Sequence, residues 1–310
     1  MAIPSSRSAD PIRSLLAIVN AGSGRGQDAL DDAVARMEAA GLAVDLRRPE
    51  EPASISEIIR EDGSGFDAIV LGGGDGTVSH SLPALMEAGR PFCLLPMGTA
   101  NDLARTLGIP FEPGEAAEII AAGRTRRIDL ATINGMPFVN VASIGLGVEI
   151  ARAHEESGLL KRILGTLNYP ISLARAWHQH RPHHATVVAD GVSRRVCYIQ
   201  IAVGNGRHYG GGLTIAESAD IDDGRLYAYI LQPVAAFTLM RLLPALRLGR
   251  LEKEAEVESF TATDIEIATG RPRKVNVDGD LREQTPARFG LLRGALEVFA
   301  PEPPPHGARQ

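Results

Sequence analysis

Along the first 130 residues, short apolar runs typical of strands alternate with segments whose apolar residues recur with the period of a helix. Short apolar runs indicate buried strands, and they lie at Leu15 to Val19, Ala68 to Leu71 and Phe92 to Leu95, with an alternating strand at Leu42 to Leu46. Segments of helical period lie between and after them, at Gln27 to Ala40, Ile55 to Ile59, Val78 to Ala88 and Ala100 to Leu107. Repeated strand–loop–helix units predict a parallel sheet with helices on both faces.

The pattern changes after about Gly123, where strand-like runs dominate. The predicted strands are Ile128 to Ile133, Phe138 to Ile144, Ala185 to Ala189, Val196 to Val203, Arg225 to Leu231, Thr263 to Ile267, Lys274 to Val277 and Leu296 to Phe299. The turn pairs that separate several of them are Asn134-Gly135, Asp190-Gly191, Asp223-Gly224 and Asp278-Gly279, which are typical of antiparallel hairpins. Helical segments interrupt the strands at 159–177 and 234–248. We therefore expect an α/β domain over residues 1–127, a β-rich domain over 128–300 and a disordered Pro-rich tail over 301–310.

Composition excludes several classes of function. The chain has 310 residues, a net charge of −6 and 5% aromatic residues, so neither the basic surface nor the stacking platform of a nucleic-acid-binding protein is expected. The two cysteines stand in apolar runs and predict buried thiols. Because the N-terminus has no signal-peptide core and no apolar run reaches about 18 residues, we expect a soluble, cytoplasmic protein without a transmembrane segment.

Three glycine-rich turns follow predicted strands and carry the candidate chemistry. They are Asn20-Ala21-Gly22-Ser23-Gly24, Gly72-Gly73-Gly74-Asp75-Gly76-Thr77 and Pro96-Met97-Gly98-Thr99-Ala100-Asn101-Asp102. Glycine lets the backbone approach a phosphate closely, a helix N-terminus adds N–H donors, and Thr77 and Thr99 add hydroxyls. The sequence has no GxxxxGK[ST], so a P-loop is excluded.

Two acidic residues, Asp75 and Asp102, stand in the same turns. A carboxylate beside a phosphate is unfavourable unless a cation lies between them, which indicates Mg²⁺. Helix N-capping is the alternative, and Asp102 is equally suited to it.

Taken together, these motifs resemble the diacylglycerol kinase catalytic-domain family, which includes bacterial soluble lipid kinases and is related to sphingosine kinases. The resemblance is carried by motifs along nearly the whole chain: Asn20-x-x-Ser23-Gly24, Gly73-Gly74-Asp75-Gly76-Thr77, Pro96-x-Gly98-Thr99-x-Asn101-Asp102, Arg127-Ile128-Asp129, Ile144-Gly145-Leu146-Gly147, Gly204-Asn205-Gly206, Asp222-Asp223-Gly224-x-Leu226 and Val275-Asn276-Val277-Asp278-Gly279. It implies a Rossmann-like first domain, a β-sandwich-like second domain and an active site in the cleft between them.

The resemblance also implies roles for individual residues. ATP would be bound by Asn20, Ala21, Gly22, Ser23, Gly24, Gly73, Gly74, Asp75, Gly76, Thr77, Val78, Ser79 and Thr99. Asp75 would organise the catalytic Mg²⁺ within a network of Asn101, Asp102 and Asp129. A structural Mg²⁺ site would comprise Asp223 with main-chain oxygens near Asp220 and Arg225.

The general base departs from the family pattern. The family has a Glu two residues after the motif's Asp, and this chain has Asp280 there, one methylene shorter. We expect Asp280 to take the proton of the attacking alcohol, with Asp278 as its substitute.

The expected partner is a lipid substrate at the inner membrane face. Two apolar segments with Arg and Lys, 159–177 and 237–250, either lie on a bilayer or pack as ordinary helices. His178, His180, His183 and His184 are interpreted as an exposed helix end rather than a metal cluster. Exposed edge strands make a homodimer a further expectation.

Two other functions stay open from the sequence. One is an NAD kinase, which has the same GGDGT turn, although its second motif normally reads Asn-Glu where this chain has Asn101-Asp102. The other is a catalytically silent nucleotide- or lipid-binding protein, which only the departure at Asp280 favours.

Overall fold

The computed structural model describes residues 12–20, 27–149 and 181–302, which form two compact units. The first unit comprises residues 1–128 and 295–310, and the second comprises 129–294. From the sequence, the last predicted strand, Leu296 to Phe299, is assigned entirely to the second domain. Two long strands, β5 (Thr125–Ile133) and β18 (Ala287–Phe299), instead run from one unit into the other, so the chain's last strand ends in the first unit.

The first unit is built on a parallel sheet in the order β2-β1-β3-β4, next to which the end of β18 pairs in parallel through Val298 and Phe92. Its elements are β1 (Ser14–Val19), α1 (Gln27–Ala39), β2 (Ala43–Arg47), α2 (Ser54–Asp62), a short 3₁₀ turn (Gly63–Gly65), β3 (Ala68–Gly73), α3 (Asp75–Ala88), β4 (Phe92–Pro96), α4 (Asp102–Leu107) and α5 (Pro113–Ala121).

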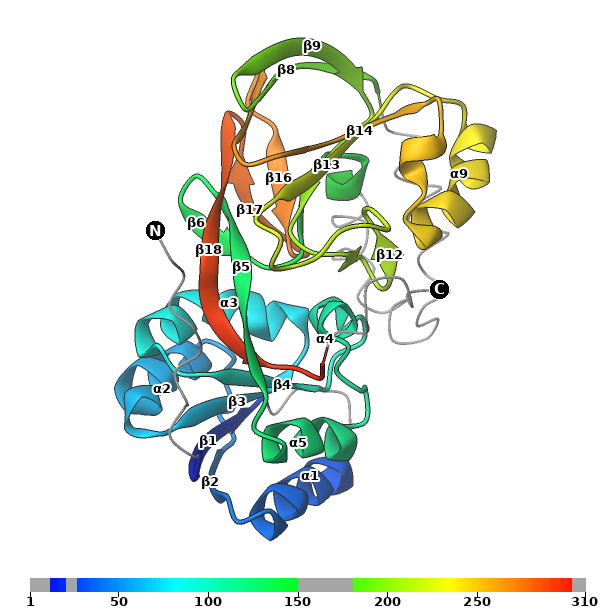
Figure 1. The fold of residues 1–310 in the computed structure, drawn as a ribbon. Helices are drawn as coiled ribbons and strands as arrows, with labels where there is room; N and C mark the ends of the chain where they lie inside the picture. The colour runs from blue at the N-terminus through cyan, green and yellow to red at the C-terminus, as the bar shows by residue number, and fades with distance from the viewer. Residues whose placement is uncertain (1–11, 21–26, 150–180, 303–310) are drawn as a thin grey trace, which may run out of the picture. The chain divides into compact units, whose positions relative to one another are not determined.

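Helices cover both faces of this sheet. Helix α1 packs against α5 and α2 packs against α3, on opposite sides of the strands (Figure 1). The central strands are apolar because they are buried on both faces, as in other parallel sheets. The predicted Rossmann-like domain is confirmed, and α5 is a helix that the sequence reading missed.

The second unit is antiparallel. Its elements are β6 (Met136–Phe138), β7 (Val141–Gly145), β8 (His183–Ala189), β9 (Val192–Tyr198), β10 (Gln200–Gly204), β11 (His208–Tyr209), β12 (Leu213–Thr214), β13 (Leu226–Leu231), α9 (Ala236–Leu248), a 3₁₀ turn (Leu251–Lys253), β14 (Val257–Ala262), β15 (Ile265–Thr269), β16 (Lys274–Val277) and β17 (Asp280–Gln284). One sheet has the order β14-β13-β10-β7-β16-β17, and β18, β15, β8 and β9 pair in a second (Figure 1).

The two sheets enclose the main core of this unit, so the predicted β-sandwich-like domain is confirmed. Alternate residues of both sheets, including Ile144, Val187, Ile201 and Phe289, point into this core. A second apolar cluster lies on the outer face of the six-stranded sheet, where Leu242 of α9 packs over Tyr229 and its neighbours.

Two predicted strands are wrong in the same way. The apolar run from Phe138 to Ile144 is β6 and β7, and the run from Val196 to Val203 is β9 and β10. In both runs the chain leaves one sheet and enters the other. A residue at such a crossing is as buried as a strand residue, so hydrophobicity alone does not reveal the break.

Three of the four predicted hairpin turns are correct. The pairs at 134–135, 190–191 and 278–279 have positive φ at both residues and join paired strands, as type I′ turns require. Asp223-Gly224 joins no such pair, because only Gly224 has a positive φ and the strand before it, β12, pairs with β11.

Three smaller interpretations are corrected. Helix α3 begins at Asp75 rather than Val78. His183 and His184 begin strand β8 instead of ending a helix, while His178 and His180 lie outside the described residues, as does the segment 159–177. Cys93 is buried, and burial raises the pKa of its thiol, but Cys197 is only partly buried.

Candidate active site

Two glycine turns of the first unit touch backbone to backbone. A Cβ on Gly98 would lie 2.5 Å from Cα of Gly74, and one on Gly74 would lie 3.0 Å from Cα of Gly98. At Gly98 no side chain fits, since real Cβ atoms essentially never come within 3.0 Å of backbone, whereas a Cβ on Gly74 would make a tight contact. Glycine at position 98 therefore lets the turn after β3 and the turn after β4 meet.

The carboxylate of Asp75 joins the same two turns. Its Oδ2 accepts the N–H of Asp102 at 3.0 Å, and its Oδ1 accepts the N–H of Leu103 at 2.9 Å. Asp75 is thus in the first turn of α3 and caps the start of α4, where an anion is favoured by unpaired N–H groups. The N-capping that was considered for Asp102 is performed by Asp75.

Asn101 closes the second turn on itself. Its Oδ1 accepts the N–H of Gly98 at 3.0 Å, and its Nδ2 donates to the carbonyl of Gly98 at 2.9 Å. Asn101 has a φ of 51°, a left-handed conformation that asparagine tolerates better than most residues. It is buried, so its role in the structure is to hold the turn.

The predicted nucleotide-binding residues of this unit divide by exposure. Gly76 and Thr99 are exposed and Thr77 is partly exposed, whereas Val78 and Ser79 are buried beneath the first turn of α3. Asn20 directly follows β1 and donates its N–H to the carbonyl of Gly72 at 3.0 Å. Ala21, Gly22, Ser23 and Gly24 lie outside the described residues.

Asp129, predicted to support Asp75, belongs to the second unit and is 5% exposed. Its carboxylate accepts the N–H of Gly224 at 2.8 Å and the N–H of Gly294 at 2.7 Å. Within that unit it ties the loop before β13 to β18.

Asp278 has a similar anchoring geometry. Its carboxylate accepts three main-chain N–H groups, from Val139 at 2.9 Å, Asn140 at 2.9 Å and Val141 at 3.1 Å. These residues form the crossing between β6 and β7. Asp278 therefore binds the β16–β17 turn to that crossing, and both of its oxygens are engaged by backbone.

Asp280 differs from Asp278, two residues earlier. It is the first residue of β17, its side chain is 43% exposed, and its Oδ2 accepts from Nη2 of Arg282 at 2.7 Å. The two side chains lie on one side of the strand because they are two residues apart. Sequence reasoning missed Arg282, although this i, i+2 spacing after a hairpin turn was the available signal.

The predicted structural metal site is the loop from Asp220 to Arg225. Oδ1 of Asp223 accepts the N–H of Arg225 at 2.9 Å, and Oδ2 accepts the hydroxyl of Tyr227 at 2.6 Å. Burial, followed by this hydrogen bond, raises the pKa of Tyr227. Asp223 is exposed, and one exposed carboxylate fits Mg²⁺, which takes one or two carboxylates and keeps several waters. No group of three His, Cys, Asp or Glu side chains suited to a metal occurs in the described part of the chain.

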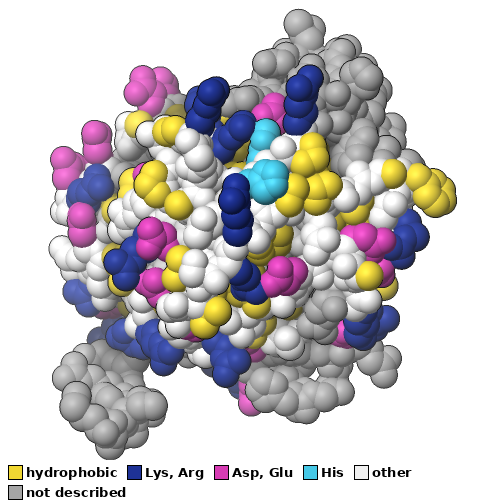
Figure 2. Space-filling view, turned by 90° about the horizontal axis from the view of Figure 1, so that it is seen from above, with side chains coloured by type: hydrophobic (Ala, Val, Ile, Leu, Met, Phe, Trp, Pro, Cys, Tyr) yellow, Lys and Arg dark blue, Asp and Glu magenta, His cyan; other side chains and the backbone are white. Residues whose placement is uncertain are grey.

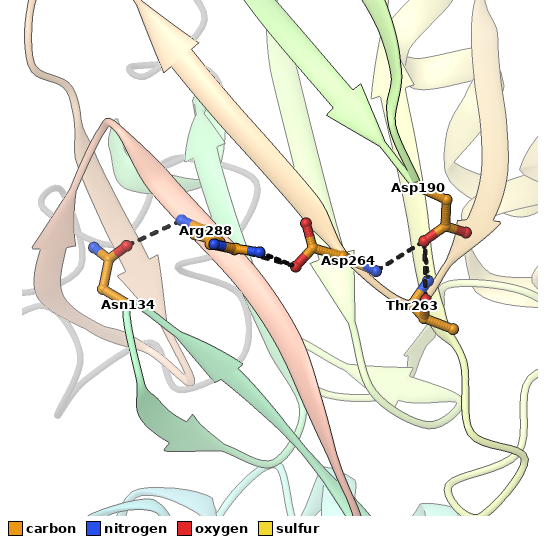
Figure 3. Close-up of polar contacts among 5 residues, drawn as sticks. All are labelled: Asn134, Asp190, Thr263, Asp264 and Arg288. Carbon is orange, nitrogen blue, oxygen red and sulfur yellow. Dashed lines mark hydrogen bonds and ion pairs between the residues drawn. The ribbon is translucent and has the colours of Figure 1, made fainter.

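A series of hydrogen bonds connects turns of the second unit with strand β18 (Figure 3). Oδ1 of Asp190 accepts from the N–H and the hydroxyl of Thr263 and from the N–H of Asp264. Oδ2 of Asp264 accepts from the guanidinium group of Arg288. The main-chain N–H of Arg288 donates to Oδ1 of Asn134. These backbone hydrogen bonds, led by that of Thr263, hold the pKa of Asp190 below its ordinary value.

His183, one of the two described histidines of the cluster that the sequence singled out, lies next to Arg273. Nη2 of Arg273 is 3.2 Å from Nδ1 of His183, and burial followed by the charge of Arg273 lowers the pKa of His183. Figure 2 shows histidine side chains with Lys and Arg side chains on one side of them and hydrophobic side chains on the other. A ring whose nitrogen faces an arginine is unsuited to binding a metal cation.

Comparison with known proteins adds to this geometry. Residues 14–133 match the model of the diacylglycerol kinase catalytic domain, and residues 141–300 match the YegS C-terminal NAD kinase beta sandwich-like domain. The chain belongs to the diacylglycerol kinase catalytic-domain family.

Two relatives show how far this similarity extends. A protein of Chromohalobacter salexigens named "Probable lipid kinase YegS-like" is 34% identical over 281 residues, which is 87% of this chain and 88% of the relative. A protein of Mycobacterium tuberculosis named "Diacylglycerol kinase" is 33% identical over 244 residues, 76% of this chain and 78% of the relative.

A solved structure agrees in fold. The crystal structure of a diacylglycerol kinase from Bacillus anthracis superposes with a TM-score of 0.80 at 26% identity, covering 94% of this chain and 98% of that one. The resemblance read from the sequence motifs is therefore confirmed, and with it lipid kinase activity in general. Within the described residues, no helix is long and apolar enough to cross a membrane.

Proposed function

We propose that this protein is an ATP- and Mg²⁺-dependent kinase that transfers the γ-phosphate of ATP to a hydroxyl of diacylglycerol or of a similar lipid. The observation that carries the proposal is the locked pair of glycine turns, in which Gly74 meets Gly98 and Asp75 caps α4. With the two turns held together in this way, Gly76 and Thr99 are exposed and Thr77 is partly exposed at the carboxyl ends of β3 and β4. Ligands of parallel sheets bind at that edge.

On the nucleotide side, the first turn of α3 supplies main-chain N–H groups, and Thr77 and Thr99 supply hydroxyls, to the phosphates. Asp75 is the carboxylate that we assign to the catalytic Mg²⁺, and Asp102 and Asp129 support it. When bound, Mg²⁺ neutralises charge on the phosphates. Asp223 with the main chain near Asp220 and Arg225 would hold the structural ion.

On the acceptor side, we assign Asp280 as the general base. The lipid oxygen forms a bond to the γ-phosphorus as the bond from that phosphorus to the bridging oxygen of ADP breaks, and the hydroxyl proton goes to Asp280. Arg282 orients the carboxylate of Asp280 through its hydrogen bond. Asp278 holds the turn that presents Asp280, which gives it a positioning role.

For the membrane side, we propose peripheral contact through α9. Phe237 is 81% exposed and Leu248 is 56% exposed. They are eleven positions apart, about three helical turns, so they lie along one face of the helix. Arg241 on that face is paired with Glu254 and Glu256, so the contact would depend on apolar insertion. Phe237→Asp should reduce flotation with lipid vesicles, and Lys253→Asp, at an exposed position beyond the helix, is the matched control. Equal flotation of all three proteins contradicts this assignment.

One experiment separates the candidate functions. The protein is incubated with γ-labelled ATP and, in parallel, mixed lipids or NAD, and the products are separated by thin-layer chromatography. We expect label in a lipid, and loss of that label in Asp280→Asn. Label in NADP would support an NAD kinase, in line with the NAD-kinase-like fold of the second domain. The absence of label in both would support a silent binding protein.

A further inference from the structure

Exposed basic side chains gather at one end of the second unit. Strand β8 begins at His183, and β15, which is antiparallel to it, ends at Thr269. The loop 270–273 leads from Thr269 to Lys274, where β16 begins. The exposed basic residues at this place, which we call the basic end, are Arg181, Arg271, Arg273 and Lys274.

The loop of the basic end is held by hydrogen bonds on both sides. The hydroxyl of Thr269 donates to the carbonyl of Arg271 at 2.8 Å. Thr285, which is 1% exposed, accepts the N–H of Arg273 on its hydroxyl at 2.9 Å and donates its own N–H to the carbonyl of Arg273 at 2.8 Å. Nη2 of Arg273 donates to Nδ1 of His183 at 3.2 Å. The loop is thus anchored to the sheet, and it presents its arginines to solvent from a fixed backbone.

The charge of the basic end is not neutralised by ion pairs. Among the described residues, none of its Arg and Lys side chains is paired with a carboxylate, whereas Arg36, Arg60 and Arg241 elsewhere each are. The charge of Glu149 acts on His183 and offsets a part of the positive charge. Because the whole chain has a net charge of −6, the basic end is a local reversal of charge.

The first turn of α9 lies at the same end of the unit. Continuing the pairing of β16 with β7 places Lys274 level with Gly145, which is opposite Gln200 of β10. Gln200 is opposite Leu231, the last residue of β13, and α9 begins five residues later. Three strand spacings separate Lys274 from Leu231, which is about 14 Å. The last turn of α9 instead contacts β12, so Phe237 is at the helix end nearer to the basic end.

A basic surface next to an exposed aromatic side chain has the properties of a membrane-binding surface. An anionic bilayer attracts Lys and Arg side chains, and each one adds to the affinity. An apolar side chain beside them inserts among the acyl chains. A soluble anion would use the charges alone and leave Phe237 in water, although it is 81% exposed.

We propose that the basic end binds the phosphate groups of anionic phospholipids, so that the second unit docks on a negatively charged bilayer next to the place where Phe237 inserts. Arg271 and Arg273 donate hydrogen bonds to phosphate oxygens, and Lys274 adds charge. His183 holds the guanidinium of Arg273 in position. The choice of a lipid partner rests on the proposed function, whose substrate is dissolved in the bilayer.

Vesicle flotation without ATP tests this docking. The vesicles consist of phosphatidylcholine alone or with one-third phosphatidylglycerol. For the wild type we expect an apparent Kd about a hundredfold lower with the anionic vesicles, and raised salt should weaken this preference. The triple variant Arg271→Gln, Arg273→Gln, Lys274→Gln should lose most of the preference. The double variant Arg271→Gln, Lys274→Gln, which keeps the contact of Arg273 with His183, should lose an intermediate part.

Two controls separate position from overall charge. Arg36→Gln, Arg47→Gln, Arg60→Gln changes the net charge equally, at ion-paired arginines of the first unit, and should keep the preference. Phe237→Ser should weaken binding to both kinds of vesicle by a similar factor. Thermal unfolding checks that each variant is folded.

The outcomes distinguish the inference from the proposed function. Equal binding of the wild type to both vesicles, or an equal loss of preference in the first-unit control and the triple variant, would overturn the inference. Calorimetric binding of inorganic phosphate that the triple variant loses, without any vesicle preference, would assign the basic end to a soluble anion and overturn it too. If the wild type binds anionic vesicles selectively but labels no lipid, the proposed function fails while the assignment of the basic end stands.

Discussion

Asp75 and Asp278 are aspartates followed by glycine, one in each unit, and in both the carboxylate is engaged by main-chain N–H groups. Asp75 lies within a helix and accepts two N–H groups from the start of the next helix, which joins two exposed turns. Asp278 lies in a left-handed turn and accepts three N–H groups from a crossing between two sheets.

The difference between them shows what a conspicuous Asp-Gly pair can do. At Asp75 the anchored backbone is itself the proposed phosphate-binding surface, so anchoring and chemistry coincide. At Asp278 the anchored turn presents another residue, Asp280, whose carboxylate is the exposed one. In the proposed mechanism, motif residues that look equivalent in sequence therefore divide into one with a direct role and one with a positioning role.

The largest expected effect comes from removing the charge of Asp75. Asp75→Asn keeps the side-chain shape but not the anion, and we expect kcat to fall by about a thousandfold, typical of losing a central electrostatic group. The measurement is initial-rate kinetics with labelled ATP and the best lipid substrate. Asp45→Asn, which alters an exposed ion pair on β2, is the control. Near-normal kcat in Asp75→Asn would place Asp75 with Asp278 as an anchor only.

Asp278 should contribute more than Asp280 to the stability of the folded protein. Asp278→Ala leaves three N–H groups without their acceptor, and we expect the free energy of unfolding to fall by about 3 kcal/mol. Asp280→Ala in the same hairpin loses only a partly exposed ion pair and should cost less than about 1 kcal/mol. Urea denaturation of both variants measures the difference. Equal losses would show that the two carboxylates do not divide the roles as we assign them.

The contact between the glycine turns is tested by Gly98→Ala. The new Cβ would meet Gly74 at 2.5 Å and Oδ1 of Asn101 at 2.8 Å, so we expect a loss of about 1–3 kcal/mol of unfolding free energy. Gly76→Ala, whose Cβ meets nothing within 4 Å, is the matched control for stability and should not lower it. Chemical denaturation provides the comparison, and an unaffected Gly98→Ala would mean that the turns can separate without cost.

The smallest effect concerns acid stability. Backbone hydrogen bonds, from Arg13 first at Asp67 and from Thr263 first at Asp190, lower the pKa of both carboxyls in the folded protein. A depressed folded pKa contributes stability above the unfolded value, about 3.9, and that stability is lost as the pH falls through the folded pKa. Asp67→Asn and Asp190→Asn should therefore weaken the fall of the thermal midpoint between about pH 5 and pH 2. If the thermal midpoint of either variant falls with pH as steeply as that of the wild type, the replaced carboxylate does not contribute to acid stability in this way.

The sequence was most informative where local chemistry decides structure. Buried strands such as Ala68 to Leu71 carry an unbroken apolar run, and Asn134-Gly135 tolerates the positive φ of a type I′ turn, so both could be predicted. It failed at Val139 and Ile199, where the chain crosses between sheets, because burial is continuous there. Asp223-Gly224 likewise has turn chemistry but no paired strands around it.

The sequence by itself determined the two kinds of domain, the glycine turns and the membership of a lipid kinase family, because period, turn residues and ordered motifs are local properties. The tertiary structure alone decided which carboxylates are held by backbone and which are presented. The partners of Asp75 are 27 and 28 residues away, and those of Asp278 are 137 to 139 residues away. A hydrogen bond is a matter of position in space, and only folding sets that position.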